Sequence, residues 1–276
     1  MKKITVITIN FNNLSGLKRT IPSVISQSYN NFEYIVIDGG STDGSKEYIE
    51  LNKKNIDFWI SERDKGIYNA MNKGIHIAHG EYCIFMNSGD HFFSSCALET
   101  AIEELDGYDY CVGRTVVVES DYASLSTPPE KISFDFIKEN SLQHQSTFIK
   151  THLLKENPYD EKLKIVADWA HFFKCWYFGK CSYKRINTIV SIYYMDGISS
   201  VCVDSTQNER EAVFKNLFAD KHKLPQKKKE SKEQKEARIT AELLFKLRRA
   251  MRKKPLARDW KILRNSFRIL WKDLFI

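Results

Sequence analysis

The first third of the chain alternates short apolar runs with segments of helical periodicity. Residues 4–9 (ITVITI), 33–38 (EYIVID), 56–60 (IDFWI) and 81–86 (EYCIFM) are rich in β-branched and aromatic residues, as strands are. Two intervening segments place apolar residues three or four positions apart: Leu14, Leu17, Ile21, Val24 and Ile25 in one, and Ile67, Ala70, Met71, Ile75 and Ala78 in the other. This order predicts an α/β fold built from βαβ units around a mostly parallel central sheet.

The second half of the chain has a less regular pattern. Residues 108–120, 144–149 and 185–195 read as strands, and residues 167–178 read as a helix. We expect this half to complete the sheet and to form a second wall for a binding site.

Composition limits the compartment and the classes of function. The six cysteines are scattered without a CxxC pair, which is typical of reduced thiols in a cytosolic protein. The N-terminus lacks the pattern of a signal peptide, and no window reaches the roughly 18 consecutive apolar residues of a spanning helix. We therefore expect a cytoplasmic protein that meets a membrane, if at all, on its inner surface.

Charge is distributed unevenly along the chain. Residues 221–276 contain 19 Lys and Arg against 6 Asp and Glu, whereas residues 1–220 contain 23 basic and 29 acidic residues. The region from about residue 205 also has helical character, interrupted by Pro225 and Pro255. The sequence thus predicts a catalytic domain over residues 1–204 and a basic, helical C-terminal extension over residues 205–276.

Polar, turn-forming residues follow three of the predicted strands. These stretches are INFNN, DGGSTDGS and NSGD. Ligands of open α/β sheets bind at the carboxyl ends of the strands, so the three loops predict a site on one rim. The alternative is that these residues serve only as turn and helix-cap residues.

The rim carries carboxylates instead of a glycine-rich phosphate loop. Neither GxGxxG nor GxxxxGK[ST] is present, whereas Asp38, Asp43, Asp64 and Asp90 all follow or border predicted strands. Carboxylates repel a diphosphate unless a divalent cation lies between them, and oxygen ligands suit Mg²⁺ or Mn²⁺. The pattern therefore predicts a metal-dependent site for a phosphorylated ligand.

Four motifs, INFNN, IVIDGGSTDGS, SERDKGIYNAMNKGIHIAHGEY and FMNSGD, resemble in order and spacing the family 2 glycosyltransferases with the GT-A fold. The resemblance covers about residues 3–200 and is closest to the bacterial branch that builds surface polysaccharides. It implies a Rossmann-like sheet with a nucleotide-binding half over about residues 1–106 and an acceptor half over about residues 107–204.

The activity that the resemblance implies is sugar transfer with inversion. The donor is a nucleotide-diphosphate sugar, with UDP as the expected nucleotide. The acceptor is a hydroxyl of a glycan, such as a polyprenyl-diphosphate-linked oligosaccharide in O-antigen, capsule or exopolysaccharide synthesis.

Matching positions of the family motifs give the expected donor site. The residues expected around the nucleotide and the donor are Thr8, Asn10, Phe11, Asn12, Asp38, Gly39, Glu62, Asp64, Lys65, Asn69, Lys73, Asn87, Ser88 and Gly89. Many relatives have an acidic residue at the position of Gly39. With a glycine there, this chain departs from the family pattern that identifies uracil. Of these residues, Lys73 is expected to approach phosphate.

The stretch NSGD stands where the family has its metal-binding DxD motif. Asp90 matches the last carboxylate, whereas Asn87 and Gly89 occupy positions that are often acidic. The expected cofactor is Mn²⁺ or Mg²⁺, bound by Asp90 and largely by the donor diphosphate. Asp196 or Ser199, in YYMDGISS, is expected to complete the metal shell or touch the diphosphate. The alternative for Asp90 is a turn or cap residue.

The resemblance also supplies a catalytic base. Asp168, in IVADWAHFF, matches the family's acid at the start of a helix, where it accepts the proton of the acceptor hydroxyl. The alternative is an acid that interacts with the helix dipole. His144 and Gln145 are expected near the donor sugar and acceptor, with a structural histidine as the alternative. Trp169 is either an acceptor platform or a core residue.

The C-terminal residues 256–275 place Leu and Trp side chains on one stripe and Arg and Lys largely elsewhere. Such a helix suits the surface of an anionic membrane. The alternatives are packing on the catalytic domain or on another subunit, which would make the protein a homo-oligomer. No nucleic-acid reading motif accompanies the basic region, so nucleic acid is not an expected partner.

Two other classes of function stay open on the sequence alone. One is a sugar nucleotidyltransferase, although INFNNLSGLKR is a poor match to the glycine-rich basic loop which that reaction needs. The other is a non-catalytic scaffold that binds a nucleotide sugar or glycan, which the missing acids at Asn87 and Gly89 would favour.

Overall fold

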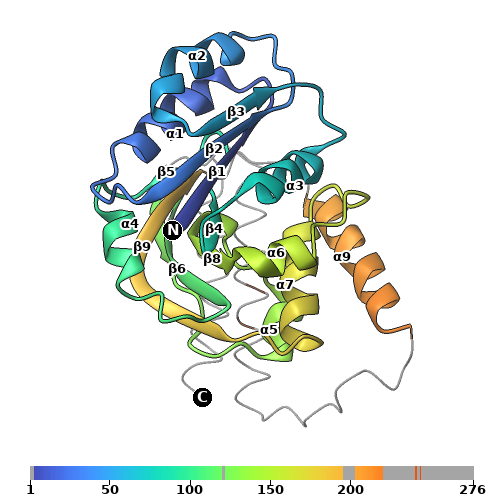
Figure 1. The fold of residues 1–276 in the computed structure, drawn as a ribbon. Helices are drawn as coiled ribbons and strands as arrows, with labels where there is room; N and C mark the ends of the chain where they lie inside the picture. The colour runs from blue at the N-terminus through green and yellow to red at the C-terminus, as the bar shows by residue number, and fades with distance from the viewer. Residues whose placement is uncertain (1–2, 120–121, 195–202, 220–239, 241–242, 244–276) are drawn as a thin grey trace, which may run out of the picture. The chain divides into compact units, whose positions relative to one another are not determined.

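The computed structural model describes residues 3–119, 122–194, 203–219, 240 and 243 (Figure 1). The chain divides into two compact units, residues 1–219 and 220–276, and the fold described below is that of the first unit. Helix α9 (Val203–Leu217) belongs to this first unit, whereas the sequence pattern placed the start of the extension at residue 205. The expected membrane-binding residues 256–275 lie outside the described residues.

A single sheet of nine strands forms the centre of this unit. The strand order is β3-β2-β1-β4-β8-β6-β9-β5, and β7 pairs with β6. The strands are β1 (Ile4–Asn10), β2 (Phe32–Asp38), β3 (Phe58–Ser61), β4 (Tyr82–Phe85), β5 (His91–Phe92), β6 (Tyr110–Val118), β7 (Ala123–Ser126), β8 (Thr147–Lys150) and β9 (Tyr183–Tyr194).

The predicted parallel arrangement holds for the first half of the sheet. Strands β1, β2, β3 and β4 all pair in parallel. In the second half, β8 pairs antiparallel with both β4 and β6, and β5 and β7 are antiparallel to their partners. Only β6 and β9 are parallel there. The sheet as a whole is therefore mixed, because continuous apolar runs reveal burial on both faces but not the direction of pairing.

Helices cover the two faces of the sheet (Figure 1). They are α1 (Leu14–Ile25), α2 (Ser45–Asn52), α3 (Ile67–Ile77), α4 (Ala97–Ile102), α5 (Phe134–Glu139), α6 (Thr151–Glu156), α7 (Ala167–Tyr177) and α9, with short 3₁₀ turns η1 (Lys53–Asn55) and η2 (His144–Ser146).

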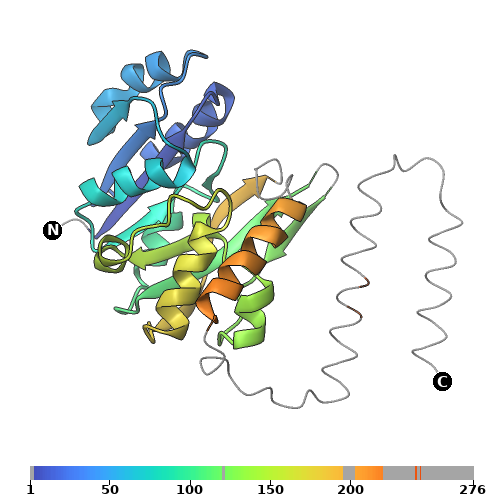
Figure 2. The same ribbon diagram turned by 90° about the vertical axis from the view of Figure 1, so that its right-hand side faces the viewer.

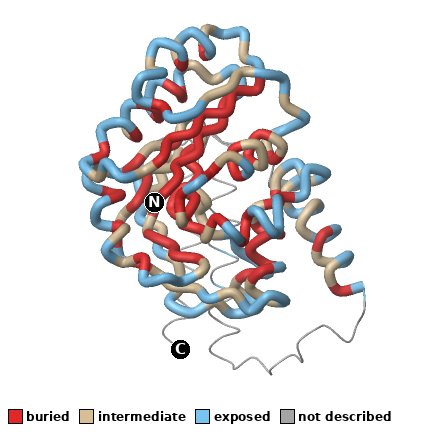
Figure 3. The backbone as a smooth tube through the Cα atoms, viewed as in Figure 1, coloured by how far each residue is buried: buried red, intermediate tan, exposed pale blue. Residues whose placement is uncertain are grey.

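The central strands are buried along most of their length (Figure 3). Their alternate residues enter two separate hydrophobic cores. Ile7 and Ile35 pack on the face covered by α3, α6 and α7, whereas Val6 and Tyr34 pack on the face covered by α1, α2 and α4. Successive side chains of a strand point to opposite faces, so both faces of these strands are buried. This is why each run is apolar throughout.

Aromatic rings attach α9 to the first unit. Figure 2 shows α5, α7 and α9 side by side. The ring of Phe214 in α9 lies 6.0 Å from Phe134 of α5 and 5.9 Å from Phe173 of α7, measured between centroids. Phe218, which follows α9, is also buried. The helix is thus part of the hydrophobic core of the first unit.

No helix in the described part of the chain is both long enough and apolar enough to span a lipid bilayer.

Candidate active site

The NSGD loop directly follows β4 and is held in place by α1. Thr20 donates from its hydroxyl to the carbonyl oxygen of Asp90 at 2.6 Å and accepts from the backbone N–H of Gly89 at 3.0 Å. Asn13 donates to the carbonyl oxygen of Ser88 at 2.9 Å. Gly89 has φ of 112°, a left-handed conformation that favours glycine. The loop is therefore a fixed structure at the end of the strand.

Close contact between α1 and this loop requires a glycine in the helix. A Cβ atom at Gly16 would lie 2.7 Å from the backbone nitrogen of Gly89 and 2.3 Å from the side chain of Asn13. Both distances are far below normal van der Waals separation. Gly16 thus lets the helix approach the loop that carries Asp90.

The loop after β2 is organised around Asp38. Its Oδ1 accepts from Asn10 at 2.7 Å and from the Ser41 hydroxyl at 2.6 Å. Its Oδ2 accepts from the Ser61 hydroxyl at 2.6 Å and from the Ser41 N–H at 3.0 Å. Burial raises the pKa of Asp38, but these hydrogen bonds outweigh that effect and hold the pKa below its ordinary value. Asp38 is fully buried and joins the ends of β1, β2 and β3.

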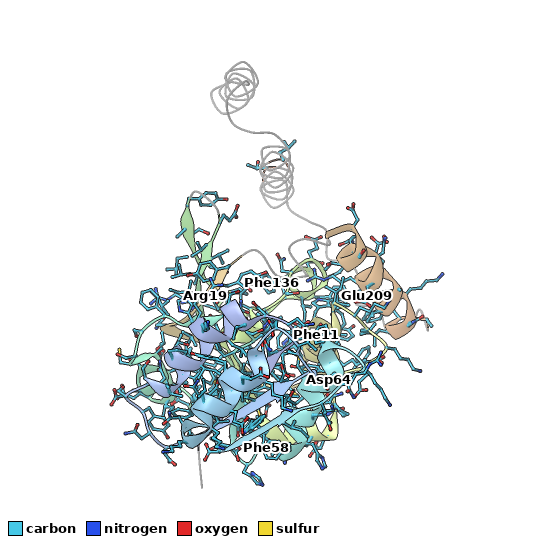
Figure 4. The ribbon with its side chains drawn as sticks, turned by 90° about the horizontal axis from the view of Figure 1, so that it is seen from above. Phe11, Arg19, Phe58, Asp64, Phe136 and Glu209 are labelled. Atoms are coloured by element: carbon cyan, nitrogen blue, oxygen red, sulfur yellow. The ribbon has the colours of Figure 1, made fainter. Side chains whose placement is uncertain are left out.

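Phe11, Gly39, Asp64 and Lys73 form a corner of the rim. A Cβ atom at Gly39 would lie 3.1 Å from both the Phe11 ring and the Asp64 carboxylate, so the glycine fills the space between them. Figure 4 shows Phe11 and Asp64 near each other in the view from above. Phe11 is 67% exposed, which presents its ring to solvent.

Lys73 is paired with two carboxylates at this corner. Its ammonium lies 2.6 Å from Asp64 and 2.6 Å from Glu62. Burial lowers the pKa of Lys73, but the hydrogen bonds to Asp64 and Glu62 outweigh it and raise the pKa. A cavity of about 360 Å³ beside α3 is lined by Glu62, Asn69 and Lys73. It does not include Asp90, His144 or Asp168.

His144 connects the Asp90 loop with the start of α7. Its Nε2 lies 3.7 Å from Asp90 Oδ2, and its Nδ1 lies 3.6 Å from Asp168 Oδ2. Burial lowers the pKa of His144, but Asp168 and Asp90 outweigh it and raise the pKa to about 9. The imidazole is therefore protonated at neutral pH and lies between two carboxylates from distant parts of the chain.

Asp168 is held by two further groups besides the imidazole. Its Oδ1 accepts from the N–H of Trp169 at 2.8 Å and from the Tyr68 hydroxyl at 3.3 Å. Burial raises the pKa of Asp168, but His144 and these hydrogen bonds outweigh it and keep the pKa below its ordinary value. Asp168 is thus ionised at neutral pH and has a fixed orientation.

Other predicted site residues lie in several environments. Gln145 is 1% exposed, and neither atom of its amide has a hydrogen-bond partner among the described residues. The side-chain amide of Asn87 lies 3.1 Å from His144 Nε2. Asn69 donates to Glu161, which also lines the cavity beside α3. Lys65 is exposed, and its N–H donates to the Asn69 side chain.

Two predicted site residues have mainly structural contacts. Thr8 is fully buried, and its hydroxyl donates to the carbonyl oxygen of Met86 inside the sheet. Trp169 is 3% exposed and donates from its indole to the carbonyl oxygen of Ile137 at 2.6 Å. Of the two roles considered for Trp169, the structure favours the core residue. The exposed Asn12 instead joins the loops after β1 and β2, because its side chain accepts from Thr42.

Several residues of the site were not singled out by the sequence. Thr20, Asn13 and Tyr68 contact the NSGD loop or Asp168, but each is far from its partner along the chain. The only signal for Thr20 is a polar residue inside an apolar helical stripe. Asp196 and Ser199, which were predicted near the metal, lie outside the described residues.

Comparison with solved structures identifies the fold. TarS of S. aureus (residues 1–349, in complex with UDP) aligns with a TM-score of 0.61 and 19% identity, over 78% of this chain and 66% of that chain. The mannosyltransferase PcManGT of Pyrobaculum calidifontis, in complex with GDP-Man and Mn²⁺, aligns with a TM-score of 0.57 and 16% identity, over 82% and 66%. The mixed α/β sheet is that of the GT-A glycosyltransferases.

Sequence comparison then gives the family. Residues 5–156 match glycosyl transferase family 2, and the chain belongs to that family. An uncharacterised glycosyltransferase of Mycobacterium tuberculosis is 34% identical over 174 residues, which is 60% of this chain and 65% of that protein. The PGL/p-HBAD biosynthesis glycosyltransferase of the same organism is 22% identical over 209 residues, covering 72% and 80%. The chain thus spans about 65% of the length of the first of these relatives.

Proposed function

We propose that this protein is an inverting glycosyltransferase that moves a sugar from a nucleotide-diphosphate donor to a hydroxyl group of a glycan. The proposal rests on the row formed by Asp90, His144 and Asp168. Asp90 belongs to the loop at the family's metal-binding position, and the ionised Asp168 lies on the other side of the His144 imidazolium. Family membership and solved GT-A neighbours in complex with UDP, UDP-GlcNAc and GDP-Man support a nucleotide sugar as the donor.

The nucleotide would bind at the corner formed by the loops after β1, β2 and β3. The exposed ring of Phe11 offers a stacking surface for a base. Lys73 carries the positive charge that a diphosphate needs at this corner, although it is shared with Asp64 and Glu62. UDP is the expected nucleotide.

A divalent cation fits the donor set only if the substrate completes its coordination. The described residues contain no group of three or more His, Cys, Asp or Glu side chains that would enclose a metal. Asp90 provides one carboxylate on a rigid loop, which suits Mn²⁺ or Mg²⁺ when most other ligands are diphosphate oxygens and water. Such an ion would supply positive charge to the departing nucleoside diphosphate.

Asp168 would act as the base in a single displacement. The acceptor oxygen bonds to the anomeric carbon as the bond from that carbon to the diphosphate breaks, and its proton passes to the Asp168 carboxylate. Attack opposite the leaving group inverts the anomeric configuration. His144, Tyr68 and the N–H of Trp169 hold the carboxylate in one orientation, and the protonated His144 offsets repulsion between Asp168 and Asp90.

The acceptor that we propose is a glycan, carried by a polyprenyl diphosphate in the synthesis of a bacterial surface polysaccharide such as O-antigen. The basic, Trp- and Leu-containing sequence of residues 256–275 supports this proposal, because it suits the anionic inner face of the cell membrane where such acceptors are carried.

The donor proposal is tested by ligand-dependent stabilisation. We expect one of a panel of UDP-, GDP-, dTDP- and CMP-sugars to raise the melting temperature in the presence of Mn²⁺, and less so with EDTA, because a ligand that binds the folded state stabilises it. Failure of every nucleotide sugar to raise the melting temperature would contradict the donor proposal.

The base is tested with Asp168→Asn. This change keeps the size of the side chain but removes its basicity, so we expect the rate of nucleotide release from the bound donor to fall by about 100-fold or more. The affinity for the donor should change by no more than about twofold. Asp135→Asn, which removes an exposed acid from the first turn of α5, is the matched control and should keep the wild-type rate. Wild-type release by Asp168→Asn would show that another group is the base.

A further inference from the structure

Helix α9 directs two adjacent charged side chains toward the segment that carries Asp168. Glu209 and Arg210 are both half-buried, whereas Glu211, the next residue, is exposed. Figure 4 labels Glu209 on this helix. Because the rings of Phe214 and Phe218 fix α9 against α5 and α7, the positions of these two charges are fixed as well.

Glu209 holds the backbone immediately before α7. Its Oε1 accepts from the N–H of Lys164 at 2.7 Å, and its Oε2 accepts from the N–H groups of Ile165 at 2.8 Å and Val166 at 3.0 Å. Helix α7 begins at Ala167, and no side chain of its own cap residue bonds to its first turn. A carboxylate from another helix therefore binds the three N–H groups immediately before α7, close to the helix end where negative charge is favourable.

Arg210 holds the residue next to Asp168. Its guanidinium carbon lies 5.3 Å from the centre of the Trp169 ring. One terminal nitrogen donates to the carbonyl oxygen of Glu139 at 3.0 Å, and the other donates to the Ser141 hydroxyl. Trp169 donates from its backbone to Asp168, so a shift of the indole would also shift the carboxylate.

We infer that Glu209 and Arg210 are positioning residues for the catalytic base, an inference that rests on the proposed role of Asp168. Glu209 sets the path of the chain into α7, and Arg210 sets the position of Trp169. Together they make α9, which lies beyond the matched family region of residues 5–156, a part of the active site. Neither residue contacts the reacting atoms.

The inference is tested with Glu209→Ala and Arg210→Gln in the full chain, with Glu211→Ala as the matched control on the same helix. We expect nucleotide release from the nucleotide sugar selected by the thermal-shift panel to fall by about 10- to 100-fold in the first two variants, because small displacements of a catalytic group have effects of that size. The dissociation constant for the donor should stay within about twofold in all three. Glu209→Gln, which keeps one acceptor oxygen, should retain an intermediate rate.

Amide hydrogen exchange gives a readout that does not depend on turnover. Exchange at residues 164–166 should be faster in Glu209→Ala than in wild type and unchanged in Glu211→Ala. A melting temperature with and without donor shows that each variant is folded and binds.

The outcomes separate this inference from the proposed function. If Asp168→Asn loses nucleotide release but Glu209→Ala and Arg210→Gln keep the wild-type rate, the positioning role is wrong and the base assignment stands. If Asp168→Asn itself keeps the wild-type rate, the base assignment is wrong, and the inference falls with it. Loss of donor affinity in parallel with rate would also overturn the inference, because it would indicate a general structural defect.

Discussion

Two histidines of this protein have pKa values displaced in opposite directions. His144 is raised to about 9 by its two carboxylate neighbours, despite the opposing effect of burial. His171 is lowered to about 4, chiefly by burial, and its Nδ1 lies 2.8 Å from the Tyr110 hydroxyl. The folded state therefore binds a proton at His144 more tightly than the unfolded chain does, and at His171 less tightly.

The signs of the two contributions to stability follow from linkage. The contribution of His144 is complete below its unfolded pKa of about 6.5 and is lost as the pH rises through about 9. The contribution of His171 is present above pH 6.5 and is lost as the pH falls toward about 4. Between pH 6.5 and 5, the unfolded chain binds a proton at His171 but the folded protein does not. Of the two histidines, His171 is therefore the one that lowers the unfolding free energy in this pH range.

We predict that His171→Gln lowers the stability of the protein at pH 7 but reduces its sensitivity to mild acid. In the wild type, the unfolding free energy should fall by about 2 kcal/mol as the pH is lowered from 6.5 to 5, because His171 stays neutral in the folded state. Denaturant unfolding at the two pH values measures this difference. His152→Gln, at an exposed histidine, is the control. An equal pH dependence in His171→Gln and wild type would contradict the assignment.

The sequence motifs identified individual residues of the site, but not the side chains that hold those residues in place. The motifs predicted roles for Asp90 and Asp168, and the structure brings both close to His144; their chemical roles stay predictions. Tyr68, Thr20 and Glu209 were not predicted, because their partners are distant in sequence and no periodicity relates them. Trp169 was left open between two roles, since its burial depends on α5 and α9.

At the scale of the elements, the strand and helix runs of the first half were predictable from local pattern. Strands β1 to β4 and helices α1 and α3 lie where apolar runs and helical spacing placed them, and α7 in the second half does so as well. The two-residue strand β5 and the exposed strand β7 were not predicted, because neither has an apolar run. The antiparallel insertion of β8 between β4 and β6 depends on tertiary contacts that a local pattern does not contain.

The contact between α1 and the NSGD loop leads to a prediction at this scale. Gly→Ala in an exposed helix interior usually stabilises by about 1 kcal/mol. At Gly16 the added methyl would lie 2.7 Å from the backbone of Gly89, so Gly16→Ala should instead destabilise the fold, by about 1–3 kcal/mol. It should also weaken the effect of Mn²⁺ on donor binding, because the loop that carries Asp90 must move.

Thermal unfolding and donor titration with and without Mn²⁺ measure the two effects of Gly16→Ala. Ser15→Ala, at the adjacent exposed position, should change the unfolding free energy by less than about 0.5 kcal/mol. Wild-type stability in Gly16→Ala would show that the helix and loop separate easily.

For the whole molecule, the boundary between the two units predicts the effect of shortening the chain. A chain that ends at residue 219 retains all of the first unit, including Phe218, so it should keep the wild-type melting temperature and donor binding. A chain that ends at residue 204, the boundary suggested by charge and composition, lacks most of α9 and its aromatic contacts and should unfold at a lower temperature.

The same shortened chain tests the proposed membrane contact. The chain of residues 1–276 should sediment with liposomes that contain anionic lipid, and less with neutral liposomes, whereas the chain that ends at residue 219 should stay in the supernatant. If both chains sediment with the liposomes, membrane binding belongs to the first unit. If neither chain sediments, the proposed membrane contact is wrong.

The order of strands in the sheet also has a consequence for biosynthesis. Strand β4 pairs with β1 on one side and with β8 on the other, and β8 begins only at Thr147. While the ribosome makes the intervening residues, the nascent chain carries the nearly finished parallel part of the sheet with a bare, apolar strand edge. Such edges recruit other chains. Slow translation between residues 86 and 147 would therefore lengthen the period in which this edge is exposed to other chains.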